Sequence, residues 1–211
     1  DDRTSRGLGD VYKRQTHSGV ISSFNAMDKL ISKKIFLKNK IKTPKYFSID
    51  RNIKISSVDK KLKLKRIYYP VIVKPINEGS SLGVELCKNK KSLIKSIKKL
   101  VKNYDRVMIE QYIPGQEIQV AIINGSPLGA IELIPKRQFY DYKAKYTKSA
   151  KTKHVMPARL SKSKYLEVLK IAKKTHNVFK CRGITRSDFK FYKGNFYLLE
   201  INTQPGMTSL S

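Results

Sequence analysis

The sequence ITRSDFKFYKGNFYLLEIN, residues 184–202, predicts two β-strands joined by a tight turn. Both halves are rich in apolar and aromatic residues, as expected of strands that pack on a core. Lys193-Gly194 lies between them, so we expect Ile184 to Tyr192 to pair with Asn195 to Ile201. This hairpin guides the rest of the interpretation, because it brings several polar side chains together.

Three oxygen-bearing side chains of the hairpin form a candidate metal site. Glu200 and Asn202 are two residues apart on one strand, so they leave the same face, and strand pairing brings Asp188 close to them. Such a set suits Mg²⁺, a hard cation that keeps water ligands and shares phosphate oxygens. The alternative is three solvated polar residues at strand ends. Glu200 argues against it, because a carboxylate within an apolar strand is costly without a cation.

Further hydrophobic patterns predict a mixture of strands and helices. We expect one helix over Gly19 to Leu37, stopped by Thr43-Pro44, and a buried strand over Tyr68 to Pro75. Asn124-Gly125 predicts a hairpin between residues 117–123 and 128–134. The remaining expected elements are strands at 84–86 and 107–113 and helices at 93–101 and 165–172. This mixture favours an α+β or α/β fold.

Two glycine-containing loops are candidates for anion binding. Glu78 to Gly83, EGSSLG, follows a strand that ends with Lys74. Small residues let backbone N–H groups approach an anion, and the lysine adds a charge for phosphate, although an ordinary turn has the same composition. Pro205-Gly206, after the hairpin, could offer N–H groups to a developing oxyanion. Phe139 to Ser149, polar and aromatic, is expected to be an ordered loop.

The composition limits the possible partners. The 211 residues include 45 Lys and Arg against 16 Asp and Glu, a formal charge of +29. Such a charge is typical of nucleic-acid binders, but these lysines are scattered and no nucleic-acid-binding motif accompanies them, so we expect no specific nucleic acid. Cys87 and Cys181 have neither disulfide-framework nor zinc spacing. Since no apolar run could cross a bilayer, we expect a soluble cytoplasmic protein without a membrane partner.

Six segments together resemble the successive motifs of D-alanine–D-alanine ligases, a family of ATP-grasp enzymes. In chain order they are MDK (27–29), VIVKPINEGSSLGV (71–84), MIEQYIPGQEIQV (108–120), FYDYKAKY (139–146), RSDF (186–189) and LLEINTQPGMTSLS (198–211). The resemblance implies an α+β ATP-grasp fold, in which two lobes with antiparallel or mixed sheets enclose a nucleotide site. The small lobe would be 46–115 and the truncated large lobe 116–211, after an unmatched segment 1–15 and a helical linker region 16–45.

The resemblance also implies roles for individual residues. Residues implied to contact ATP are Lys29, Lys74, Ser80, Ser81, Glu110, Gln111, Tyr112, Ile113, Glu117 and Lys145. Among these, Glu110 and the backbone that follows it would hold adenine, Glu117 the ribose hydroxyls, and the lysines the phosphates. The implied ligands of two Mg²⁺ ions, which Mn²⁺ could replace, are Asp188, Glu200 and Asn202. Residues implied in catalysis or substrate binding are Ser80, Lys145, Tyr146, Arg186, Gly206 and Ser211.

The implied reaction joins two D-alanines at the expense of ATP, through an acyl phosphate, for peptidoglycan synthesis. Arg186 and the Gly206 backbone would stabilise the oxyanion, Tyr146 would shape the second subsite, and Ser211 would hold a carboxylate. The alternatives are another ATP-grasp carboxylate–amine ligase and, less favoured, a basic nucleic-acid-binding module. Tyr146 argues against a D-lactate-adding enzyme. The intact enzyme would be a homodimer. Because family members have an N-terminal domain and a C-terminal helix outside this region, we expect this chain alone to make dipeptide very poorly.

Overall fold

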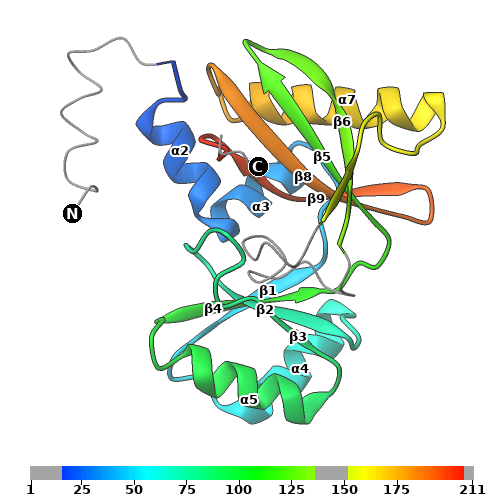
Figure 1. Ribbon diagram of the computed structural model, residues 1–211. Helices are drawn as coiled ribbons and strands as arrows, with labels where there is room; N and C mark the ends of the chain where they lie inside the picture. Colours follow the sequence, from blue (N-terminus) through cyan, green and yellow to red (C-terminus); the bar gives the residue numbers. More distant parts are fainter. Residues whose placement is uncertain (1–15, 136–151, 207–211) are drawn as a thin grey trace. The chain divides into compact units, whose positions relative to one another are not determined.

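The computed structural model describes residues 16–135 and 152–206, which form an α+β fold (Figure 1). The chain divides into two compact units. One contains the described residues up to Lys42, Gln116–Ile134 and the described residues from Lys153; the other contains Thr43–Gly115 with Pro135 and Thr152. We call them the five-stranded unit and the four-stranded unit, after their sheets. The segment 1–15 and the loop expected at 139–149 lie outside the described residues.

The five-stranded unit is built on an antiparallel sheet with the strand order β7-β6-β5-β8-β9. Its strands are β5 (Gln116–Ile123), β6 (Ser126–Ile134), β7 (Lys153–Val155), β8 (Ile184–Tyr192) and β9 (Asn195–Asn202). Its helices are α2 (Val20–Met27), α3 (Lys29–Lys38) and α7 (Lys162–Val178). Helix α7 packs on one face of the sheet, and α2 and α3 pack beside the edge strand β9.

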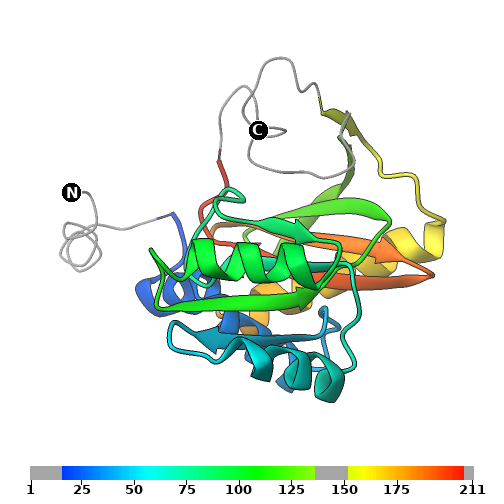
Figure 2. The ribbon, with the colours of Figure 1, turned by 90° about the horizontal axis from the view of Figure 1, so that it is seen from below.

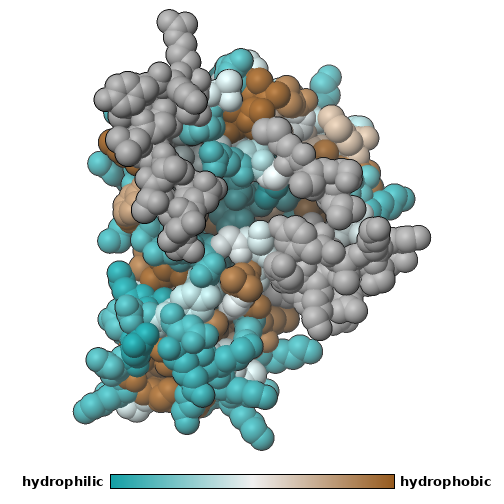
Figure 3. Space-filling model, turned by 60° about the vertical axis from the view of Figure 1, so that its left-hand side comes forward, coloured by the Kyte–Doolittle hydropathy of each residue, from teal (hydrophilic) through white to brown (hydrophobic). Residues whose placement is uncertain are grey.

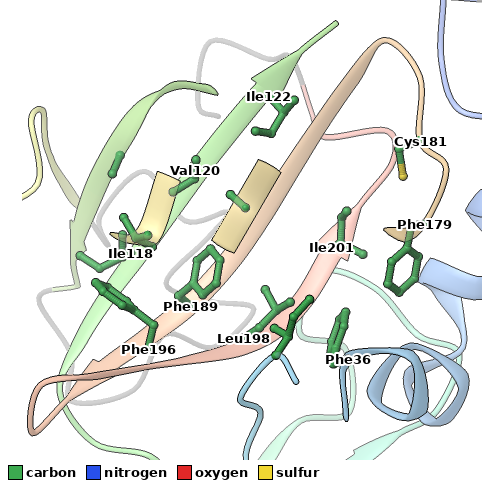
Figure 4. Packing of buried hydrophobic residues seen from close by; sticks show 14 of the residues in the cluster. Phe36, Ile118, Val120, Ile122, Phe179, Cys181, Phe189, Phe196, Leu198 and Ile201 are labelled. Carbon is green, nitrogen blue, oxygen red and sulfur yellow. The ribbon is translucent and has the colours of Figure 1, made fainter. Parts of the chain in front are cut away.

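The core of this unit lies on the α7 face of the sheet (Figure 4). Phe189 of β8 and Phe196 of β9 meet edge to face with ring centroids 6.2 Å apart. Phe36 of α3 packs near Leu198 of β9, and its ring centroid lies 5.5 Å from that of Phe179. Removal of this apolar surface from water drives folding of the unit and fixes which face of each strand remains polar.

Both hairpins of this unit form where the sequence predicted them. Asn124 and Gly125 connect β5 to β6 with φ of 48° and 77°, and Lys193 and Gly194 connect β8 to β9 with φ of 47° and 75°. Positive φ at both central residues defines the type I′ turn, whose twist matches that of the paired strands. The predicted hairpin at residues 184–202 is therefore confirmed.

The single helix predicted over Gly19 to Leu37 is wrong, because Asp28 divides it into α2 and α3. Asp28 has an extended backbone, and its carboxylate accepts hydrogen bonds from Leu30 N at 2.8 Å and Ile31 N at 2.9 Å. It is thus the N-cap of α3 and satisfies two N–H groups that a helix start leaves without backbone partners.

The four-stranded unit has the strand order β1-β4-β2-β3, again antiparallel. Its elements are β1 (Tyr46–Asp50), α4 (Ile55–Lys65), β2 (Val71–Pro75), β3 (Glu85–Cys87), α5 (Lys90–Leu100) and β4 (Arg106–Gln111). Helices α4 and α5 lie side by side on one face (Figure 2), bridged by Lys90 and Asp59, with a separate hydrophobic core beneath them. The sequence did not predict β1.

The excess lysine lies mainly on solvated surfaces. Exposed lysines of α4 and α5 include Lys60, Lys63, Lys65, Lys91, Lys95 and Lys98. Hydrophilic residues accordingly cover most of the four-stranded unit on the face shown in Figure 3. Both cysteines are free and buried. Among the described residues, no helix combines the length and apolar character that a membrane span requires.

Candidate functional site

The face of the five-stranded sheet opposite α7 carries polar side chains in three successive rows. Strand pairing places Glu117 beside Lys190, then Gln119 beside Asp188, then Ala121 beside Arg186. The β8–β9 pairing extends the second row to Glu200 and the third to Asn202. Because side chains on one face recur every second residue, neighbouring rows lie roughly 6.8 Å apart along the strands. The rows thus form an ordered polar surface on β5, β8 and β9.

The middle row contains the two carboxylates predicted to bind metal. Asp188 and Glu200 are register partners, and the Asp188 side chain is only 7% exposed. Asn202 Nδ2 donates to Asp188 Oδ2 at 3.3 Å. The hairpin therefore brings the three predicted ligands together, although their role as ligands stays a prediction.

Arg186 neutralises the carboxylate at the centre of this surface. Its Nε donates to Asp188 Oδ1 at 2.8 Å and its Nη2 to Oδ2 at 2.9 Å. This paired arrangement uses the planar guanidinium fork and compensates for the burial of the carboxylate. It also places a permanent positive charge beside Asn202 in the third row.

A β-bulge in β9 accompanies this arrangement. The register changes between Asp188 paired with Glu200 and Phe189 paired with Leu198, so Leu199 is the extra residue. Leu198 and Ile201 both enter the core, whereas Glu200 lies on the polar face between them. Bulges bend and twist a strand locally and are often found next to functional sites, where they redirect a side chain.

The donor set fits a hard divalent cation. Asp188 and Glu200 offer carboxylate oxygens, and rotation of the Asn202 amide would present Oδ1 in place of Nδ2. Among the described residues, no group of three or more His, Cys, Asp or Glu side chains is placed to hold a metal ion. A cation here would thus rely on the amide, on water and on ligand oxygens to complete its coordination.

Helix α3 contributes two lysines with unusual burial. Lys29, its first residue, is 8% exposed, and Lys33, one turn later, is fully buried. An ammonium group is rarely buried without compensating interactions, and both of these lysines have interaction partners. Lys29 was predicted to contact phosphate. Lys33 was missed, although its four-residue spacing from Lys29 places it on the same helix face.

The four-stranded unit has its own buried charged pair. Lys74 Nζ of β2 and Glu110 Oε1 of β4 lie 3.0 Å apart, with side chains 10% and 3% exposed. They project from the face opposite α4 and α5, because the alternating residues Val73 and Ile109 enter that core. Tyr46 is paired with Glu110 in the register, and its pKa is raised by burial and by this carboxylate.

The loop after β2, predicted to bind an anion, contains a tight turn. Ser80 and Ser81 have φ of 51° and 60°, and Leu82 N donates to Gly79 O at 2.9 Å. Gly83, with φ of 69°, lies so close to Pro75 that a Cβ would come within 2.9 Å of its ring. Glycine is therefore required there by both backbone conformation and space.

The remaining predicted site residues lie at or just after the ends of β4 and β9, or outside the described residues. Gln111 N donates to Lys45 O at 2.8 Å, Tyr112 N donates to Pro70 O at 3.4 Å, and Ile113 is buried. Gly206 is exposed at the end of the described residues. Lys145, Tyr146 and Ser211 lie outside the described residues.

Lys190 is a further residue that the sequence did not single out. Its Nζ lies 3.0 Å from Glu117 Oε2 across the β5–β8 pair, and the two side chains are 19% and 11% exposed. No sequence signal pairs β8 with β5, because about 60 residues separate these strands.

Comparison with known proteins identifies the family. The family model described as D-ala D-ala ligase C-terminus matches residues 35–211. The chain belongs to the D-alanine–D-alanine ligase family. A D-alanine–D-alanine ligase of Pelagibacter ubique is 57% identical over 196 residues, covering 93% of this chain and 64% of that relative. A ligase of Fusobacterium nucleatum is 40% identical over 200 residues, covering 94% of this chain and 63% of its own length.

Solved structures of the ligase family agree with this assignment. The D-alanine–D-alanine ligase of Bacillus anthracis superposes with a TM-score of 0.81 at 31% identity, covering 97% of this chain and 65% of that one. VanG D-Ala:D-Ser ligase of Enterococcus faecalis gives a TM-score of 0.83 at 26% identity, covering 98% of this chain and 61% of that one. The fold is therefore the ATP-grasp fold of these ligases. The chain spans slightly less than two thirds of the length of these relatives.

Proposed function

We propose that the full-length protein joins two D-alanines at the expense of ATP, and that this chain contributes its nucleotide- and metal-binding residues. The observation that carries the proposal is the order of the three polar rows. Glu117 would bind ribose, Asp188 and Glu200 would hold the cation at the phosphates, and Arg186 would act at the reacting carbonyl. The row spacing of roughly 6.8 Å lets these groups follow an extended nucleotide from ribose to γ-phosphate. A Bacillus anthracis relative has been crystallised in complex with ATP, which supports the nucleotide assignment.

Mg²⁺ would bind through Asp188, Glu200 and Asn202, and when bound it would neutralise charge on the phosphates. We propose that Lys74 and the Ser80-Ser81 loop of the four-stranded unit contact ATP phosphates, and that Lys29 of the five-stranded unit also has this role. Lysine supplies a point charge for phosphate, and the loop supplies backbone N–H groups.

The chemistry needs positioning more than covalent participation of the protein. The carboxylate of the first D-alanine attacks the γ-phosphorus, which gives an acyl phosphate and releases ADP. The amine of the second D-alanine attacks the acyl carbon, and inorganic phosphate leaves. Arg186 would stabilise the oxyanion of this second step, because its guanidinium remains positive throughout. Held orientation and exclusion of water would protect the acyl phosphate from hydrolysis.

Magnesium-dependent ATP binding tests the proposal directly. Isothermal titration calorimetry at moderate salt should detect ATP binding by the 211-residue chain with Mg²⁺ and a loss of most of that binding in Glu200→Gln. Glu167→Gln is the matched control, because Glu167 lies on α7 in a partly exposed ion pair with Lys164. Absence of ATP binding by a wild-type chain with a cooperative unfolding transition would contradict the proposal, as would equal binding by Glu200→Gln.

The second substrate is tested separately. We propose D-alanine, although VanG shows that a related fold is found in a D-Ala:D-Ser ligase. Phosphate release by a full-length version, measured with D-alanine, D-serine and D-lactate, distinguishes these acceptors and another carboxylate–amine ligase. We further propose that the full-length enzyme is a cytoplasmic homodimer. Normal dipeptide synthesis by the 211-residue chain alone would contradict our expectation that this chain alone makes dipeptide very poorly.

A further inference from the structure

Lys190 and Glu117 form an ion pair at the end of the polar face where the ribose would lie. We propose that Lys190 is a positioning residue that holds Glu117, so that the ribose hydroxyls contribute to nucleotide affinity. This inference rests on the proposed function, because it takes Glu117 as the residue that accepts hydrogen bonds from ribose. Lys190 lies outside the six sequence motifs. Its proposed role would make the protein favour ribose nucleotides over deoxyribose nucleotides.

The surroundings make Lys190 the cationic neighbour of Glu117 in the sheet. Glu117 lies between Leu133 of β6 and Lys190 of β8, so its two register partners are one apolar residue and one cation. The Glu117 side chain is 11% exposed, and Lys190 Nζ lies 3.0 Å from its Oε2. A carboxylate buried to this extent depends on hydrogen bonds and charge compensation to stay in place.

The pair also suits a ligand that is both a diol and a polyanion. A carboxylate has about four lone-pair positions, so an ammonium group on one oxygen leaves others for hydroxyl donors. An isolated carboxylate would repel the phosphates of ATP, whereas the pair has no net charge. Lys190 therefore lets Glu117 serve as an acceptor for ribose without adding negative charge to the site.

Removal of the ammonium group should reduce the importance of the ribose hydroxyls. In the wild type, we expect ATP to bind about tenfold more tightly than the deoxy nucleotide that lacks the hydroxyl donating to Glu117, which is 2′-deoxy-ATP or 3′-deoxy-ATP, since a hydrogen bond to a charged group is lost. In Lys190→Met, which keeps an apolar stem of similar length, Glu117 loses this cation and the ratio should fall to about twofold. Lys190→Arg retains the cation and should keep most of the ratio.

The experiment measures the dissociation constants of ATP and the two deoxy nucleotides by calorimetry, with Mg²⁺ at moderate salt. Lys173→Met is the matched control: Lys173 is exposed on α7, and the change removes the same charge from a chain that binds a polyanion. Glu117→Gln gives the reference ratio for a weakened acceptor. If Lys190→Met does not fold, Lys190→Gln replaces it, and its ratio must also fall below that of the wild type.

The outcomes separate the two hypotheses. No ATP binding by the folded wild type would overturn the proposed function itself. ATP binding with a hydroxyl-dependent ratio that is unchanged in Lys190→Met or Lys190→Gln would overturn the role of Lys190 alone. An equal reduction of affinity for all three nucleotides, as in a general charge effect, would also overturn it. A reduced ratio in Lys190→Met, retained in Lys190→Arg and Lys173→Met, is the expected result.

Discussion

Gly83 offers a sharp test of how the loop after β2 is built. Its φ of 69° is a conformation that residues with a Cβ rarely adopt, and a Cβ placed there meets Pro75 Cγ at 2.9 Å and Cδ at 3.0 Å. Leu100 Cδ2 would lie 3.3 Å away. Pro75 is a buried residue of β2 with a closed ring, so it has no rotamer with which to move aside.

The cost of Gly83→Ala follows from two contributions. Holding alanine in the left-handed conformation costs about 1 kcal/mol, and forcing a methyl group into a packed site costs about 1–3 kcal/mol. We therefore expect the free energy of unfolding to fall by about 2–4 kcal/mol. Two other glycines separate these contributions. Gly79, in the same loop, has no positive φ and no atom within 4 Å of the place a Cβ would occupy, whereas Gly194 has φ of 75° with the same open space.

Urea unfolding followed by circular dichroism measures the three variants against the wild type. Gly79→Ala should change stability by less than about 0.5 kcal/mol, and Gly194→Ala should cost about 1 kcal/mol, from the backbone alone. A Gly83→Ala variant no less stable than Gly194→Ala would refute the reasoning. It would mean that Pro75 and Leu100 move aside for the added methyl group without lowering the free energy of unfolding.

Three further predictions concern charge and capping. Asp28→Ala should lower the free energy of unfolding by about 1 kcal/mol in urea titrations, and Asp28→Asn, which keeps the cap, by much less. Burial lowers the pKa of His176 below its usual 6.5. The unfolded chain then binds the proton more readily, so stability should fall as the pH drops below about 6.5, and thermal melts of His176→Gln should show a shallower decline. Hydrogen bonds from Arg159 lower the pKa of Glu132, so this carboxylate stabilises the fold above its unfolded pKa near 4.5 and loses that contribution on acidification through its folded pKa. Arg159→Met should accordingly be less stable than the wild type at pH 7 by a margin that narrows at about pH 3; a constant margin would contradict this linkage.

The elements that could be predicted are those whose signals are local. Asn124-Gly125 and Lys193-Gly194 mark two-residue turns, and the apolar residues on either side define strands of the correct length. Glu200 and Asn202 could be placed on one face from strand periodicity alone. Their approach to Asp188 then followed from the turn. The family and the ATP-grasp fold were also predictable, because the motifs occur in order.

The elements that were missed depend on contacts between distant segments. Strand β1 is short, and its pairing with β4 crosses more than fifty residues. The break at Asp28 interrupts a continuous helical pattern through a side-chain cap rather than through proline or glycine. The pairing of Lys190 with Glu117 follows only from the register of β5 and β8. These features belong to tertiary pairing, which hydrophobic periodicity does not encode.

The β8–β9 hairpin has a consequence for the order in which the polar face assembles during folding. Asp188 and Asn202 are 14 residues apart, whereas Glu117 and Lys190 are about 70 apart. Closing the longer loop costs about 1.5 kcal/mol more chain entropy. The β8–β9 parts of the middle and third rows can therefore form by local pairing from the Lys193-Gly194 turn, whereas the Glu117–Lys190 pair of the first row forms only when β5 docks. Charge repulsion between Asp188 and Glu200 would then oppose formation of the β8–β9 hairpin. Arg186, only two residues from Asp188, can reduce this repulsion as soon as the hairpin forms, because its guanidinium pairs with the Asp188 carboxylate.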